Sequence, residues 1–155
     1  METNHSPVTE KARLQHEEEF DNHQFVVAFN RVQKRTNQTA HDKGWYESAL
    51  KDVVDSFAFR SETEARCKAE LQGIEDARRI ALMHSELSEG LEGLRHGNPP
   101  SDHIPEFSAI EEELADCIVR IMDISQERGW KVAEALIAKA KFNQTRSHRH
   151  GGKKF

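Results

Sequence analysis

The sequence is poor in the residues that interrupt or cross-link a chain. Its 155 residues include only four prolines, eight glycines and two cysteines. Sandwiches and barrels of many short strands need frequent glycine and proline turns, so this composition favours amphipathic helices. Cys67 and Cys117 lack CxxC spacing and cannot form a disulfide framework or a thiolate zinc site. We expect both to be small buried residues of helices.

Long apolar runs are also missing. No stretch approaches the ~20 apolar residues of a membrane span, and the opening residues, METNHSPVTEK, lack the apolar core of a signal peptide. We therefore expect a cytoplasmic protein with no membrane partner. The length suits one domain with a single core.

The net charge of −5 conceals two parts of opposite sign. The first 134 residues hold 16 basic and 27 acidic residues, a net charge of −11, whereas six basic residues and no acids follow Glu134. Such a basic end can contact phosphates. It could also bind nucleic acid with a steep salt dependence, but the acidic body opposes that partner and we do not expect it.

Apolar residues recur at helical spacing along most of the chain, which predicts an all-α fold of about five helices. Ser61 and Ser108 are predicted N-caps, each with a glutamate three residues on, and Gly129 is a predicted helix end. The expected helices cover residues 9–35, 47–60, 62–95, 109–127 and 131–142. Residues 1–8 are expected to be a disordered lead-in, residues 9–146 one helical domain, and residues 147–155 a basic tail.

Two pairs of acids border the apolar stripes of the third and fourth expected helices. Glu86 and Glu89 lie beside a stripe that includes Met83, Leu87 and Leu91, and a second pair, Glu113 and Asp116, borders the next stripe. If the stripes pack together, four carboxylates share one groove and repel each other unless a cation neutralises them. Mg²⁺ or Mn²⁺ suits such oxygen ligands. The alternative is that both pairs belong to ordinary solvated helix faces.

Two glycines follow the first acid pair. Gly90 and Gly93 leave bare backbone beside the acids, at a cost in helix propensity of roughly 1 kcal/mol each. They make room for a closely approaching group.

The arrangement ExxE, 23 intervening residues and then ExxD resembles the MazG-like all-α nucleoside triphosphate pyrophosphohydrolase superfamily. The words that carry the resemblance are His84-Ser85-Glu86-Leu87-Ser88-Glu89, Leu94-Arg95-His96-Gly97-Asn98-Pro99-Pro100, Glu112-Glu113-Leu114-Ala115-Asp116 and His150-Gly151-Gly152-Lys153. The resemblance implies Mg²⁺-dependent cleavage of a (d)NTP to the monophosphate and pyrophosphate. It implies that the metal ligands and catalytic acids are Glu86, Glu89, Glu113 and Asp116.

The resemblance also extends to the basic end. Lys139, Asn143 and Arg146 match the family's Lys-x-x-x-Asn-x-x-Arg stretch, which implies contact with the substrate's phosphates or nucleoside. We expect Arg120 and Lys153 to join them around the phosphates. A carboxylate of the site, or the neighbouring Glu112, is expected to take the proton of the attacking water.

The family resemblance implies a homodimer or tetramer that acts in nucleotide metabolism, with house-cleaning of the nucleotide pool as one role. The alternative is a non-catalytic helical module that binds a nucleotide or a partner through the same groove. Residues 51–75 look like an insertion relative to compact members of the family.

Overall fold

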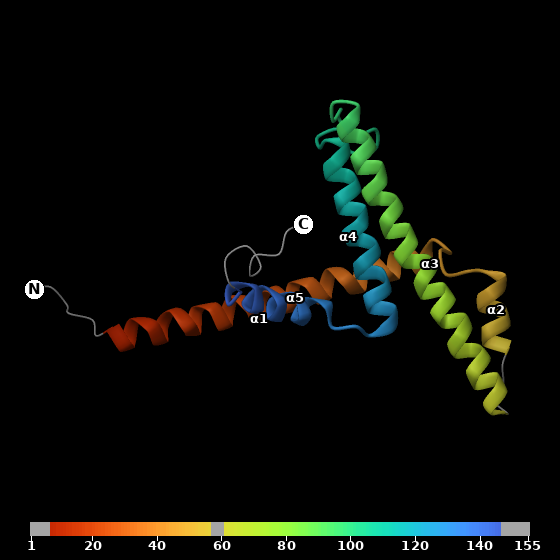
Figure 1. Cartoon of the computed structure of the whole chain (residues 1–155), viewed down its shortest axis with the longest axis horizontal. Coiled ribbons are helices and arrows are strands. Elements are labelled where there is room, and N and C mark those ends of the chain that lie inside the picture. The colour runs from red at the N-terminus through yellow and green to blue at the C-terminus, as the bar shows by residue number, and fades with distance from the viewer. Residues whose placement is uncertain (1–6, 57–60, 147–155) are drawn as a thin grey trace, which may run out of the picture. The chain divides into compact units, whose positions relative to one another are not determined.

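The computed structural model describes residues 7–56 and 61–146, and these form five α-helices (Figure 1). The helices are α1 (Pro7–Asp42), α2 (Ala49–Ser56), α3 (Glu62–Arg95), α4 (Ala109–Arg128) and α5 (Val132–Gln144). Within these described ranges there is no strand, only an isolated bridge between Pro100 and Ser108. The predicted all-α class with about five helices is confirmed.

The helix bounds follow the expected ones closely in the second half of the chain. α3 has the predicted bounds and continues through Gly73, where an added Cβ would meet nothing within 4 Å. α1 is longer than expected at both ends, since it begins at Pro7 and continues to Asp42. α2 is shorter than the predicted 47–60, and residues 57–60 lie outside the described part, as do most of the expected lead-in and the whole basic tail.

Two serines and one glycine set the ends of the long helices, as predicted. The Ser61 hydroxyl accepts a hydrogen bond from the N–H of Glu64 at 3.2 Å at the start of α3. At the start of α4 the Ser108 N–H donates to the Glu111 carboxylate at 2.8 Å. Gly129 ends α4 with φ of 67°, a left-handed conformation that suits glycine.

The chain divides into two units. One consists of α1 up to Val32 together with α5, and the other extends from Gln33 to Trp130. In the first unit Lys141 pairs with Glu18 at 3.5 Å. The second unit contains the last part of α1 with α2, α3 and α4, and it holds all four acids of the predicted metal site.

Helices α3 and α4 form an antiparallel hairpin joined by the loop at residues 96–108 (Figure 1). The small buried core of this hairpin consists of Met83, Cys117 and Ile124, with Ile121 packed against it. Arg128 donates to Asp76 at 2.8 Å and ties the open end of the hairpin. None of the described helices is both long and apolar enough to cross a membrane.

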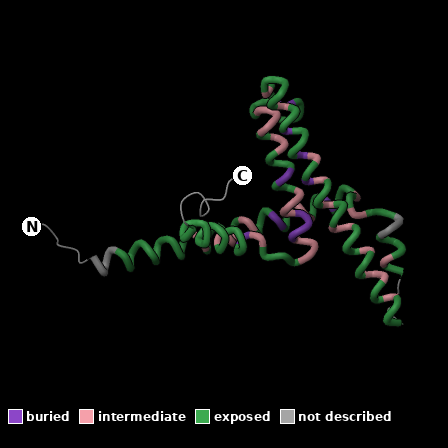
Figure 2. The backbone as a smooth tube through the Cα atoms, in the orientation of Figure 1, coloured by how far each residue is buried: buried purple, intermediate pink, exposed green. Residues whose placement is uncertain are grey.

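The two apolar stripes pack together only in part, through Met83 on α3 and through Cys117 and Ile121 on α4. Most stripe residues stay exposed along the hairpin (Figure 2): Ile80, Leu87, Leu91 and Leu94 on α3, and Leu114 and Ile118 on α4. The α3 face that meets α4 is instead centred on Met83, Glu86 and Gly90, which are all buried. The helices meet along the edge of the stripe because the glycines permit a close approach there.

Candidate functional site

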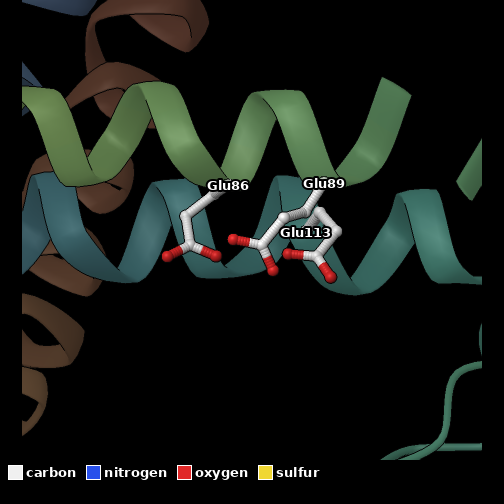
Figure 3. Close-up of side chains that lie close together, drawn as sticks. All are labelled: Glu86, Glu89 and Glu113. Carbon is white, nitrogen blue, oxygen red and sulfur yellow. The ribbon is translucent and has the colours of Figure 1, made fainter. Parts of the chain in front are cut away.

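Three of the four predicted acids converge where α3 and α4 pack together (Figure 3). Glu86, Glu89 and Glu113 each offer a carboxylate oxygen, and these atoms all lie within 4.8 Å of one another. Glu86 is buried with 5% of its surface exposed, Glu113 is half-buried and Glu89 is exposed. Glu86 therefore forms the buried end of the site, and Glu89 forms the end that is exposed to solvent.

The fourth predicted acid, Asp116, is not part of this three-carboxylate cluster. It lies on α4, exposed, and lines a neighbouring groove. Burial and the nearby Glu86 carboxylate raise the pKa of Asp116. Asp116 therefore borders the cluster, although its carboxylate lies apart from the other three.

Gly90 and Gly93 bring the acid-bearing backbones together. A Cβ at position 90 would lie 2.7 Å from Ile110 Cδ1 and 3.3 Å from Glu113 Cβ. A Cβ at position 93 would lie 3.0 Å from the Cβ of Ala109. The group that packs closely against these two glycines is thus α4 itself. This contact places Glu113 close to Glu86 and Glu89.

The negative charge of the three carboxylates exceeds the positive charge of the side chains that pair with them. Burial, a hydrogen bond to Glu86 and the charge of Glu89 raise the pKa of Glu113 to about 7. Arg120 pairs with Glu86, with Nε 2.5 Å from Oε1. Hard oxygen donors with uncompensated charge are what Mg²⁺ and Mn²⁺ prefer, so the residues present fit a divalent cation.

Glu112 serves the loop before α4 rather than the cluster. Its carboxylate accepts from the buried Ser101 hydroxyl at 2.5 Å and lies 2.8 Å from His103 Nδ1. The Ser101 hydroxyl in turn accepts from the N–H groups of His103 and Ile104. The Ser101 bond lowers the pKa of Glu112, so it is a weaker base than Glu113 and the prediction that it takes a proton loses support.

A polar network around Asp123 was not predicted from the sequence. Asp123 is buried and accepts from Tyr46 Oη at 2.8 Å and Asn37 Nδ2 at 3.0 Å. Arg79 lies 3.3 Å from the other Asp123 oxygen, and its guanidinium sits 4.0 Å from the centre of the Tyr46 ring. Burial and Asp123 raise the pKa of Tyr46, which therefore stays a neutral donor.

The sequence signal for this network was weak. Asp123 lies seven positions after Asp116, at nearly the same helical angle. Its partners Asn37 and Tyr46 lie 86 and 77 positions away along the chain.

A groove of about 370 Å³ adjoins the acids in the same unit. Its lining includes Trp45, Arg78, Arg79 and Arg120 together with Asp116 and Asp123. This volume is within the range of small-molecule sites. Arg120, one of the phosphate-binding residues predicted from the sequence, lines this groove.

The other predicted phosphate-binding residues belong to the terminal unit. Lys139 and Asn143 are exposed on α5, and the Lys139 ammonium lies 4.8 Å from the centre of the Phe142 ring. Arg146 comes after the helix end at Gln144, so the expected single helical face does not reach it. Lys153 lies outside the described residues. Lys139, Asn143 and Arg146 belong to the unit that contains α5, whereas the four acids belong to the unit from Gln33 to Trp130.

Comparison of the chain with protein-family models, with curated proteins and with solved structures finds no match.

Proposed function

We propose that this protein is an Mg²⁺-dependent nucleoside triphosphate pyrophosphohydrolase of the MazG-like type, with Mn²⁺ as the alternative ion. The observation that supports the proposal best is the cluster of Glu86, Glu89 and Glu113, whose oxygens lie within 4.8 Å of one another. The carboxylates of such a cluster repel one another unless they share a cation. All three belong to the ExxE and ExxD motifs that carry the resemblance to the family. House-cleaning of the nucleotide pool is the role we infer from the family.

Bound Mg²⁺ would supply the positive charge that lets the acids and a triphosphate share the site, and it would activate a water for attack. Glu86 and Glu89 on α3 and Glu113 on α4 would hold it. Arg120 fixes the orientation of Glu86 through Nε and Nη2.

The proposed reaction is hydrolysis of the bond between the α- and β-phosphates. Water adds to the α-phosphorus, pyrophosphate leaves, and one carboxylate of the site takes the proton of the water. Asp116 borders the cluster from the groove side and is retained as a proposed fourth acid. The arginines near it can neutralise the charge of the leaving pyrophosphate.

The test is pyrophosphate release from a panel of (d)NTPs with Mg²⁺. We expect Glu86→Gln and Asp116→Asn to lower kcat at least about 100-fold, because an acid of the site is lost. Glu111→Gln is the matched control, since Glu111 is exposed on the same helix and caps it. Equal turnover by all these proteins refutes the assignment of the acids. Nucleotide and metal binding without turnover of any nucleotide supports the alternative of a non-catalytic binding module.

We further propose a homodimer in which a second copy covers the exposed apolar face of α3 and α4. Leu87, Leu91 and Ile118 are each about half exposed, and exposed apolar residues that gather in a patch mark an interaction surface. We expect Ile118→Glu to shift the protein to monomers in light scattering. Val53→Glu, at an exposed position on α2, is the control that leaves the dimer intact. A wild-type monomer with full activity contradicts this proposal.

A further inference from the structure

The groove beside the acids contains arginines whose hydrogen-bonding capacity is only partly used. We infer that it binds the polyphosphate chain of an anionic ligand through the unused N–H groups of Arg78 and Arg120. The ligand class rests on the proposed function, but the binding needs no turnover. The unpredicted member is Arg78, which the sequence pattern did not single out.

Arg78 uses one edge of its guanidinium within its own helix. Nε and Nη2 donate to the two oxygens of Glu75 at 2.9 and 2.7 Å. This bidentate pair fixes the plane of the guanidinium. Among the described residues, no partner is recorded for Nη1. Arg78 is largely exposed and lines the groove, so this remaining donor is available to a ligand.

Arg120 repeats this arrangement on α4. Its Nε and Nη2 both point to Glu86 Oε1, and within the described part of the chain Nη1 again has no recorded partner. The Arg120 side chain is 40% exposed, whereas that of Glu86 is 6% exposed. Arg120 thus contacts Glu86 of the acid cluster and also lines the groove. A phosphate chain that starts at the acids can continue along these two arginines.

Two other charges of the groove, Arg79 and Asp123, already balance each other, whereas Asp116 adds a negative charge to the lining. Arg79 pairs with Glu75 at 3.0 Å and with Asp123 at 3.3 Å, and its side chain is 12% exposed. Asp123 also accepts from Tyr46 and Asn37, so it repels an incoming anion less than a free carboxylate does. The donors left for a ligand therefore come from Arg78 and Arg120.

Trp45 provides a built-in reporter at this groove. Trp45 is 60% exposed and lines the groove, while its backbone N–H donates to the Ala40 carbonyl at 3.0 Å. Gly44 before it has φ of 72°, and Tyr46 after it is held by Asp123. The indole is thus presented on an anchored turn. The chain has one other tryptophan, Trp130, so a Trp130→Phe background isolates its emission.

The experiment titrates inorganic tripolyphosphate with Mg²⁺ into the Trp130→Phe protein and follows Trp45 emission. We expect saturable binding. Arg78→Gln and Arg120→Gln should each weaken this binding about 10- to 100-fold, because each removes one charge-assisted hydrogen bond to the phosphate chain. The matched control is Arg95→Gln, because Arg95 makes the same i, i+3 pair on α3, with Glu92, away from the groove. Arg120→Lys tests whether charge alone suffices, since lysine lacks the fork geometry.

Arg78→Gln is the decisive variant, because Arg78 does not contact the acids. Its Mg²⁺ affinity, measured by calorimetry without phosphate, is expected to equal that of the wild type. If it binds tripolyphosphate as tightly as Arg95→Gln does, the inference is overturned, even where nucleotides are hydrolysed. If no nucleotide is hydrolysed but Arg78→Gln still weakens tripolyphosphate binding, the groove assignment stands and only the hydrolase proposal falls. Tighter binding of nucleoside triphosphates than of tripolyphosphate identifies a nucleotide as the source of the phosphate chain.

Discussion

Replacing Glu113 with glutamine tests the electrostatic origin of the acidic cluster without any assay of activity. Glu113 has a pKa of about 7 against its usual 4.5, because burial and the carboxylates of Glu86 and Glu89 disfavour its charge. The folded protein therefore binds this proton more tightly than the unfolded chain does. Stability is lost as the pH rises from about 4.5 through about 7, and Glu113→Gln removes this loss.

The magnitude follows from the difference in pKa. Each pKa unit corresponds to about 1.4 kcal/mol, so the rise from 4.5 to about 7 gives an upper bound of about 3.5 kcal/mol. Because the Glu113 side chain is partly exposed to solvent, we expect about 1–2 kcal/mol. The metal-free variant should exceed the wild type in free energy of unfolding by that amount at about pH 8. The difference should vanish near pH 4.5.

The assay is urea unfolding followed by helical circular dichroism, with a chelator present, over the pH range from about 4.5 to 8. Glu111→Gln is the control, and its effect has the opposite sign. Hydrogen bonds from Ser108 lower the pKa of Glu111. Replacing the Glu111 carboxylate therefore destabilises the protein at pH values above the usual carboxyl pKa. A Glu113→Gln protein with wild-type stability at about pH 8, or with a gain that does not change with pH, refutes the reasoning. Added Mg²⁺ should reverse the order, because the wild type binds the ion more tightly.

Two further substitutions test the packing of the hairpin. Gly93→Ala should lower the free energy of unfolding by about 1–2 kcal/mol, because the new methyl would lie 3.0 Å from the Cβ of Ala109, which is fixed to the α4 backbone. Gly73→Ala, in open space on the same helix, should raise it by about 0.5–1 kcal/mol in chemical denaturation. Equal effects at both sites would contradict the close helix contact. Asp123→Asn should cost about 2–4 kcal/mol in the same assay, since it breaks a buried ion pair. Asp55→Asn, in an exposed pair, should change stability by less than about 0.5 kcal/mol, and a similar cost for both would show that burial is not the cause.

The helices could be predicted from the sequence because their signals are local. Apolar periodicity, the serines at positions 61 and 108 and the glycine at position 129 act within one or two turns, and they determined α3 and α4 almost to the residue. The length of α1 was underestimated, because its apolar residues thin out after Val32 while the helix continues to Asp42. The end of that helix depends on contacts with distant residues, such as that of Asn37 with Asp123.

The site could be predicted in part. Helical angles placed Glu86 and Glu113 beside the stripes, but they could not tell which edge of a stripe would become the contact. The glycines decided this, and they buried Glu86 while leaving Leu87 and Leu91 exposed. Residues that join through three dimensions, such as the Tyr46 and Asp123 pair, leave no periodic signal in the sequence.

If the proposed ion binds at the cluster, the bare backbone at Gly90 bears on the size of that ion. A methyl at this position would press on Glu113 Cβ, 3.3 Å away, and shift it by a few tenths of an ångström. Mg²⁺ binds oxygen at about 2.0–2.1 Å and Ca²⁺ at about 2.3–2.6 Å, so a similar few tenths separate these two ions. Discrimination between a small and a large cation would then depend on a residue that has no side chain and binds neither.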